Sequence, residues 1–188
     1  KDTFDADFWL WSICPDKDTE PLKTIEFVNG HDVGTSLYSI MEKDKQWWAT
    51  LKVKGTFHHD FSLQNYPFDD QTLTIDMEEA TLDTRDLVYT GDNSESKIEP
   101  ALNLNSWRIR SFELKAGSVT HPTTFGDPTL QGGDSTYAQL QLKIGIDRNS
   151  PWGEFLKSTF AVFIAACLAL VSLLITDGRV GLLGATMF

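Results

Sequence analysis

Residues 158–176 read STFAVFIAACLALVSLLIT, a stretch without a charged side chain. A helix that crosses a lipid bilayer needs about 20 mostly apolar residues, and this stretch is long enough. Before it, from Phe4 to Ile146, apolar residues alternate with polar ones. Such alternation is typical of β-strands with one buried face. The sequence therefore predicts a β domain followed by a membrane helix.

The β region divides into short alternating segments separated by turn signals such as Asn29-Gly30. Strands are expected at Phe4–Trp11, Lys23–Val28, Gly34–Met41, Gln46–Phe57, Gln71–Met77, Trp107–Leu114 and Tyr137–Ile146. Gly91–Ser106 and Ala116–Ser135 are expected to be loops, because the first is polar and the second is rich in glycine and proline. Short strands without helical periodicity favour an all-β sandwich, here followed by α-helical transmembrane structure.

The chain of 188 residues has room for one domain and a short membrane region, and its net charge is −11 at pH 7. An acidic balance disfavours nucleic acid and anionic lipid as partners, and it favours cations as permeant ions or bound modulators. It equally serves solubility. The sequence holds no glycine-rich phosphate cradle, nucleophile elbow or zinc-ligand spacing, so we expect neither enzyme activity nor a cofactor.

Two pairs of adjacent titratable residues, His58-His59 and Glu78-Glu79, read as strand residues. Successive side chains of a strand point to opposite faces of the sheet. The histidines therefore cannot chelate one metal ion locally, and the carboxylates cannot face each other as glycoside hydrolysis requires.

The segment Tyr66-Pro67-Phe68-Asp69 predicts a turn, because proline fixes φ. We expect the two aromatic rings to bury this turn and to leave the carboxylate at its tip. An ordinary strand connection also has this composition. The longer run Phe61–Leu73 (FSLQNYPFDDQTL) closely resembles the signature loop of the pentameric ligand-gated ion channels, the Cys-loop receptor family.

Further segments resemble the same family in the same order along the chain: Asp83–Val88 (DTRDLV), Trp107–Ile109 (WRI), the pre-membrane Arg148, and Asp177–Val180 (DGRV) as the link into the pore-lining helix. The two cysteines that flank the loop in animal receptors are absent, since Cys14 and Cys167 lie elsewhere. In this the chain is similar to prokaryotic members of the family.

The resemblance implies an immunoglobulin-like extracellular ligand-binding sandwich over residues 1–148, with the family's first strand expected before Phe4. It implies the first transmembrane helix and the start of the pore-lining helix over residues 149–188. The chain would form a homopentamer in the bacterial inner membrane, multi-pass and in contact with lipid, with the sandwich on the extracytoplasmic side. A small-molecule or ion effector bound between subunits would gate a pore, and the pore is expected to be cation-selective.

The resemblance assigns the coupling of sandwich to membrane to five residues: Tyr66, Pro67, Phe68, Asp69 and Arg148. Asp69 and Arg148 are expected to meet, and opposite charges about 4 Å apart attract by about 4 kcal/mol at an effective dielectric near 20. The alternatives are that each is solvated at a headgroup surface, or that Arg148 pairs with neighbouring Asp147.

By the same resemblance, Asp177 lies at the cytoplasmic mouth of the pore and Phe188 lies further along the same helix as a candidate hydrophobic gate. A ring of five carboxylates about 5 Å from the axis would stabilise a monovalent cation by about 4 kcal/mol before screening. A simple helix N-cap at Asp177 is the alternative, and the two roles are compatible.

Candidate ligand contacts are the aromatic residues Phe27, Trp47, Trp48 and Phe125, because an aromatic cage holds an amine by cation–π attraction. Packing in a core or interface is the alternative for each. Candidate ligands for Ca²⁺ as a modulator are the acidic residues Asp83, Asp86, Asp92 and Glu95, with solvated surface as the alternative.

Two other classes of protein compete with a channel. A membrane-anchored β-sandwich that binds a ligand or partner would cross the membrane once and form no pore. A secreted carbohydrate-active sandwich would need two facing carboxylates in a cleft, and it leaves the apolar stretch at 158–176 unexplained.

Overall fold

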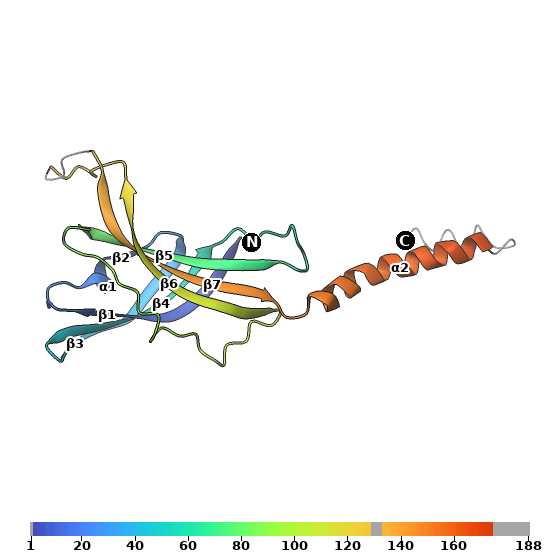
Figure 1. Ribbon diagram of the computed structural model, residues 1–188, viewed down its shortest axis with the longest axis horizontal. Helices are drawn as coiled ribbons and strands as arrows, with labels where there is room; N and C mark the ends of the chain where they lie inside the picture. The colour runs from blue at the N-terminus through green and yellow to red at the C-terminus, as the bar shows by residue number, and fades with distance from the viewer. Residues whose placement is uncertain (1, 129–132, 175–188) are drawn as a thin grey trace. The chain divides into compact units, whose positions relative to one another are not determined.

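The computed structural model describes residues 2–128 and 133–174 (Figure 1). The chain is mostly β-sheet, with one long apolar helix at the C-terminal end of the described part. It divides into two compact units. The sheet unit holds the described residues within 1–62, 71–103 and 109–146, and the helix unit holds 63–70, 104–108 and the described residues from 147 onward.

Three strands form the first sheet, in the order β1-β4-β3: β1 (Thr3–Cys14), β3 (Gly30–Lys43) and β4 (Gln46–His58). β4 pairs antiparallel with both of its neighbours. The β3–β4 hairpin turns at Asp44 and Lys45, whose φ angles of 52° and 62° suit the two-residue turn that matches strand twist. The hairpin predicted around residues 42–45 is confirmed.

Four strands form the second sheet, in the order β2-β5-β7-β6: β2 (Ile25–Phe27), β5 (Asp70–Asp83), β6 (Trp107–His121) and β7 (Ser135–Arg148). The strand expected at Lys23–Val28 is shorter than predicted. Its first residues belong to the one-turn helix α1 (Pro21–Thr24), which has a proline in its first turn, a position that proline favours.

The loop expected at Ala116–Ser135 is wrong at its beginning, because β6 continues to His121. Gly117 keeps its backbone N–H and so does not interrupt a strand. The strand ends just before Pro122, which has no N–H to donate to a neighbour.

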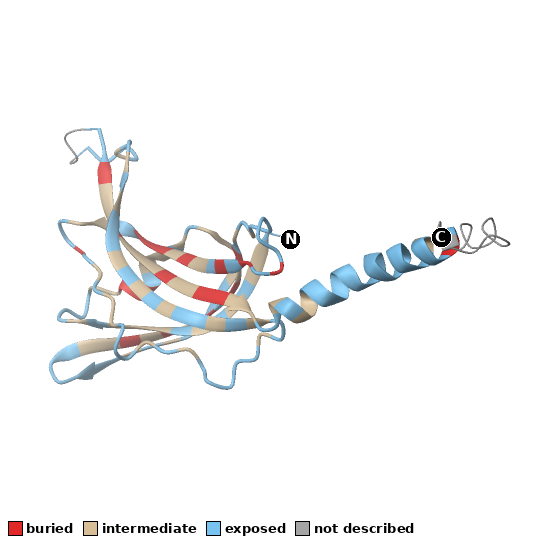
Figure 2. Cartoon of the chain, turned by 45° about the vertical axis from the view of Figure 1, so that its right-hand side comes forward, coloured by how far each residue is buried: buried red, intermediate tan, exposed pale blue. Residues whose placement is uncertain are grey.

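The core lies between the two sheets. Phe57 of β4 packs in one buried cluster with Ile75 and Met77 of β5 and with Leu142 of β7. In β4, Leu51 and Val53 are buried as the alternation predicts. Figure 2 shows the buried positions as separated bands along the strands. The predicted all-β architecture with a buried face on each sheet is therefore observed.

The helix α2 (Pro151–Leu174) follows β7 after two residues. Within the described part, Pro151–Leu173 is the one helix long and apolar enough to cross a membrane. Its length is about 35 Å at 1.5 Å per residue, against a hydrocarbon core of about 30 Å. Most of its side chains are exposed (Figure 2). These properties support a membrane association, and the second helix expected after it lies outside the described residues.

One carboxylate is fully buried in the sheet unit. Glu79 of β5 is 0 % exposed and accepts hydrogen bonds from the Thr24 and Tyr89 hydroxyls at 2.8 Å and 3.0 Å. The backbone N–H groups of Thr81 and Leu82 also donate to it, at 3.1 Å and 3.3 Å. Glu79 thereby links α1 and the chain that follows β5 to the sheet. A buried carboxylate needs such hydrogen-bond donors to replace the water that it loses.

Tyr89→Phe is expected to lower the free energy of unfolding by about 1 kcal/mol at neutral pH, because it removes one hydrogen bond to Glu79. Burial first, and then the charge of Glu79, raise the pKa of Tyr89 far above its usual value. A raised pKa stabilises the fold fully below about pH 10, where an unfolded tyrosine is still neutral, and the benefit falls as the pH rises further. Urea unfolding between pH 7 and 11 should therefore show a shallower alkaline decline for Tyr89→Phe than for the wild type; parallel curves would contradict this.

Candidate functional site

The segment 63–70 of the helix unit folds into two successive tight turns. The N–H of Tyr66 donates to the Leu63 carbonyl at 3.1 Å, and that of Phe68 donates to the Asn65 carbonyl at 2.7 Å. The Tyr66–Pro67 peptide bond is cis. The predicted turn is confirmed.

The burial within this loop is the reverse of the expectation. Asp69 is buried at 4 % exposure, whereas the Tyr66 and Phe68 side chains are about half exposed, at 47 % and 48 %. A carboxylate can be buried at low cost when a cation pairs with it, and here a tertiary partner supplies that cation. Local composition gave no sign of this partner.

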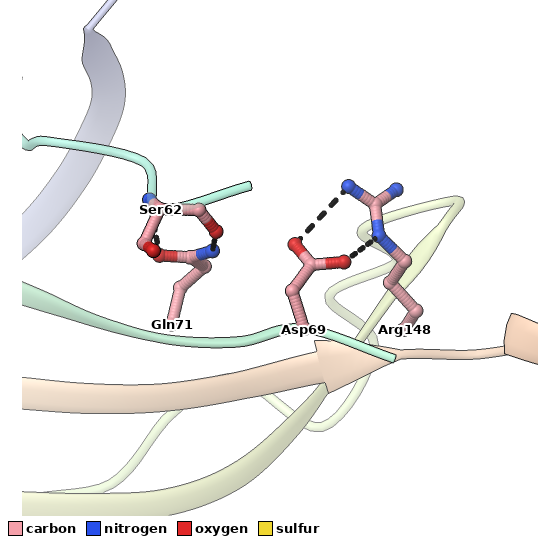
Figure 3. Close-up of polar contacts among 4 residues, drawn as sticks. All are labelled: Ser62, Asp69, Gln71 and Arg148. Atoms are coloured by element: carbon pink, nitrogen blue, oxygen red, sulfur yellow. Dashed lines mark hydrogen bonds and ion pairs between the residues drawn. The ribbon is translucent and has the colours of Figure 1, made fainter. Parts of the chain in front are cut away.

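Arg148, the last residue of β7, donates hydrogen bonds from two nitrogens to the Asp69 carboxylate (Figure 3). Its Nε donates to Oδ1 at 2.6 Å and its Nη2 donates to Oδ2 at 3.3 Å. The side chains are 15 % and 2 % exposed, so the pair is largely removed from water. The ion pair expected between the loop and the end of the sheet is present, and its geometry is the two-point fork that arginine favours.

Two aromatic rings flank the same guanidinium. The Cζ atom of Arg148 lies 4.7 Å from the centre of the Tyr66 ring and 4.4 Å from that of Trp107, the first residue of β6. Both distances suit cation–π attraction. Arg148 thus engages three parts of the helix unit: the loop, the start of β6 and its own strand. Trp107 was in the motif WRI, but its contact with Arg148 has no local sequence signal.

Asp147, the alternative partner considered for Arg148, accepts hydrogen bonds from Arg108. The Arg108 Nε donates to its Oδ1 at 3.0 Å and Nη2 donates to its Oδ2 at 2.8 Å. These bonds raise the pKa of Arg108, which holds its charge. The next residue, Asn149, donates its N–H to the Ser106 carbonyl at 2.9 Å and its side-chain amide to the Asn105 carbonyl at 2.7 Å. Residues 147–149 are therefore fixed against residues 105–108, immediately before α2.

Gln71 links the two residues on either side of the loop 63–70. Its amide nitrogen donates to the Ser62 carbonyl at 2.8 Å, and its amide oxygen accepts from the Ser62 N–H at 3.3 Å (Figure 3). Gln71 is 5 % exposed. Sequence reasoning treated it as an ordinary strand residue and missed this role.

The candidate ligand aromatics do not converge on one place. Phe27 packs against Phe8 and Phe57 in the core, with ring centres 6.3 Å and 6.2 Å apart. Trp47 and Trp48 are successive residues of β4 and so point to opposite faces, with Lys17 and Lys43 lying 5.2 Å and 3.8 Å from their ring centres.

Phe125 has different surroundings. Its ring is 66 % exposed and lies 5.5 Å from His121 and 6.2 Å from Tyr137. His121 Nε2 in turn lies 2.6 Å from a carboxylate oxygen of Glu78. His121 and Tyr137 come from neighbouring strands β6 and β7. The sequence analysis selected neither, because His121 lay in the expected loop Ala116–Ser135 and Tyr137 looked like one position in an alternating strand.

The four acidic residues proposed for Ca²⁺ are not brought together. Asp83 accepts from the Arg85 side chain at 2.8 Å, which lowers its pKa, and Asp92 accepts from the N–H groups of Ser94 and Glu95. Among residues 2–128 and 133–174, no group of three or more His, Cys, Asp or Glu side chains could hold a metal ion. The structure therefore gives no support for Ca²⁺ at Asp83, Asp86, Asp92 and Glu95.

The pore candidates Asp177 and Phe188 lie outside the described residues. Comparison of the chain with models of protein families and with curated proteins gives no match. The function is therefore inferred from the motifs and from the geometry around Arg148.

Proposed function

We propose that the chain belongs to a subunit of a prokaryotic pentameric ligand-gated ion channel, with an immunoglobulin-like extracellular sandwich and a cation-selective pore. The observation that carries the proposal is the position of Arg148. It joins the Tyr66–Asp69 loop to the residues that lead into α2 through a buried two-point ion pair and two aromatic contacts. A joint of this kind transmits movement because its parts cannot separate without exposing or stranding a charge.

Gating requires two states of this joint. An effector opens a pore only if it binds the open state with higher affinity than the closed state. In the proposed mechanism, effector binding between sandwiches shifts the loop, and Arg148 passes the shift to the start of α2 at Pro151. Phe125, beside His121 and Tyr137, is the best placed of the candidate ligand contacts, because its ring is exposed on an aromatic surface that a neighbouring subunit can complete.

Assembly into a homopentamer finds support in the outer face of the three-stranded sheet. Ile13, Trp48 and Met41 lie in register across β1, β4 and β3 on that face. Ile13 and Met41 are 52 % and 42 % exposed, and nearby Trp9 is 53 % exposed. Large exposed apolar residues grouped on one face favour a protein interface. In a homo-oligomer, the surface that covers them belongs to a second copy of the chain.

The proposal also places the protein in the bacterial inner membrane, with the sandwich on the extracytoplasmic side and several membrane crossings per subunit. Its direct test is current through the purified full-length protein in a planar lipid bilayer. Protons, Ca²⁺ and a primary alkylamine are added in turn as effectors. Effector-dependent steps of current are expected. Absence of current with every effector, together with a single membrane crossing, would overturn the proposal.

A membrane-anchored binding protein without a pore is the second candidate. The observation in its favour is that the described part holds one helix that could span a membrane. The two candidates differ in the number of crossings of the full-length protein, which labelling of single introduced cysteines from each side of the membrane measures.

Asp177→Lys is expected to reduce the preference for cations at least about tenfold, since a change of about 1.4 kcal/mol in relative ion free energy has this effect. The measurement is the reversal potential under a KCl gradient, which should move toward the chloride equilibrium potential. Glu154→Lys is the matched control, because Glu154 lies in the first turn of α2 and pairs with Lys157 at 3.1 Å. An unchanged reversal potential in Asp177→Lys would remove Asp177 from the pore.

A further inference from the structure

Three aromatic side chains of the helix unit form an exposed cluster, which we call the aromatic cluster: Phe68, Trp152 and Phe155. The Phe68 ring centre lies 5.0 Å from that of Trp152 and 6.2 Å from that of Phe155, and the latter two are 6.1 Å apart. Their exposures are 48 %, 68 % and 40 %. The cluster thus joins the tip of the loop to the first turns of α2 without being covered by the described chain.

The position of the cluster along α2 sets its depth in a membrane. The uncharged part of α2, residues 158–174, is about 26 Å long at 1.5 Å per residue, close to the hydrocarbon thickness of about 30 Å. Trp152 precedes this stretch by six residues, or about 9 Å along a helix axis. The headgroup layers add about 5–8 Å on each side of the hydrocarbon. With the uncharged residues centred in the hydrocarbon, Trp152 falls about 7 Å outside it, at headgroup level.

The chemistry of the cluster fits that level. Tryptophan gathers at membrane interfaces because its ring is apolar and its N–H is polar. Between the cluster and the uncharged stretch, Lys157 pairs with Glu154 at 3.1 Å and has a side chain 76 % exposed, which lets the ammonium reach lipid phosphates. Beyond it, exposed Phe160 and Phe163 continue the apolar surface into the hydrocarbon.

We propose that the aromatic cluster is a lipid-contact site that inserts Phe68 and Trp152 among the headgroups and glycerol esters of zwitterionic phospholipid in the extracytoplasmic leaflet. The net charge of −11 disfavours anionic lipid as the occupant. The inference requires α2 to span the bilayer, but it does not require a pore. It means that the loop carrying Asp69 touches lipid directly, so that the lipid environment acts on the same loop as Arg148.

The test uses the full-length protein in phosphatidylcholine vesicles that carry a nitroxide quencher either on the choline headgroup or near the end of the acyl chain. Tryptophan fluorescence of the wild type is compared with that of Trp152→Phe. We expect the headgroup quencher to remove a smaller fraction of the tryptophan fluorescence from Trp152→Phe than from the wild type. The deep quencher should remove equal fractions from both proteins. Trp9→Phe is the matched control, because Trp9 is also exposed, at 53 %, but belongs to the sheet unit. It should retain the full headgroup quenching.

A second variant tests the loop itself. Phe68→Trp in the Trp152→Phe background should restore headgroup quenching, since position 68 lies at the same depth. Equal headgroup quenching in the wild type and Trp152→Phe would overturn the proposal, and would mean that another segment or a second copy covers the cluster. Failure of Phe68→Trp to restore quenching, with unchanged circular dichroism, would overturn the lipid contact of the loop. Neither result depends on ion conduction, so each is distinguishable from failure of the proposed channel function.

Discussion

Arg148→Ala is expected to abolish the current evoked by an effector, or to raise the half-maximal effector concentration about 10- to 100-fold, while effector binding is retained. The shift corresponds to a coupling free energy within the usual range of about 1–3 kcal/mol. The substitution removes the cation that pairs with the Asp69 carboxylate, whose side chain is 2 % exposed, and removes the cation–π contacts with Tyr66 and Trp107. Loss of one partner of a buried pair costs about 3–5 kcal/mol, enough to free the loop from the start of α2.

The matched control is Arg108→Ala. Arg108 also makes a two-nitrogen ion pair with an aspartate of the helix unit, but its side chain is 66 % exposed. Water screens an exposed ion pair, so the pair contributes little and the gating of Arg108→Ala should be close to that of the wild type. Bilayer recordings and an effector-binding titration separate gating from binding. Normal gating in Arg148→Ala and in Asp69→Ala would show that this joint does not couple the sandwich to the membrane.

Arg148→Lys keeps the charge and makes a finer distinction. A lysine cannot reproduce the two-point fork of the guanidinium, so an intermediate shift is expected. If Arg148→Lys behaves like the wild type, charge and not geometry is what the joint requires. The interaction free energy from a double-mutant cycle of Asp69→Asn and Arg148→Gln then measures the pair itself.

Glu79→Ala is expected to lower the free energy of unfolding by about 3 kcal/mol or more, because it leaves two hydroxyls and two backbone N–H groups without their acceptor. For a domain of this size, such a loss lowers the melting temperature by about 10 °C. Thermal unfolding of the full-length protein in detergent, followed by circular dichroism, measures it.

Glu26→Ala is the control for Glu79→Ala, because Glu26 lies on neighbouring β2 and is exposed. Its melting temperature should change by no more than about 2 °C, as is usual for a surface substitution. A small change in Glu79→Ala would mean that water replaces the carboxylate at no cost, and that α1 does not depend on it.

Strands were predictable wherever one face is buried, because alternation then marks every second residue. This holds for β4, where Leu51 and Val53 are inward, and for β7, where Ala138, Leu142 and Ile146 are buried. The positions at which strands end were less predictable. Gly117 looked like a loop residue, but β6 continues through it and ends at His121, before Pro122, which has no N–H to donate.

The candidate site was predictable where a motif carried it and hidden where tertiary contacts decide. Asp69 and Arg148 are 79 positions apart, and only the resemblance indicated their meeting. The burial of Asp69 and the role of Trp107 depend on that meeting and have no local signature. Glu78 and Glu79 do diverge as adjacent strand residues should. Nothing in the local pattern indicated that Glu78 would reach His121 and that Glu79 would reach a buried set of donors.

The Gln71–Ser62 hydrogen bonds have a consequence for the environments in which the protein can work. Residues 61–73 contain no cysteine, and Cys14 and Cys167 of this chain are free thiols. Here a buried amide closes the loop reversibly at 2.8 Å. Maturation of this loop therefore needs no oxidising folding machinery, and thiol reductants leave its closure intact.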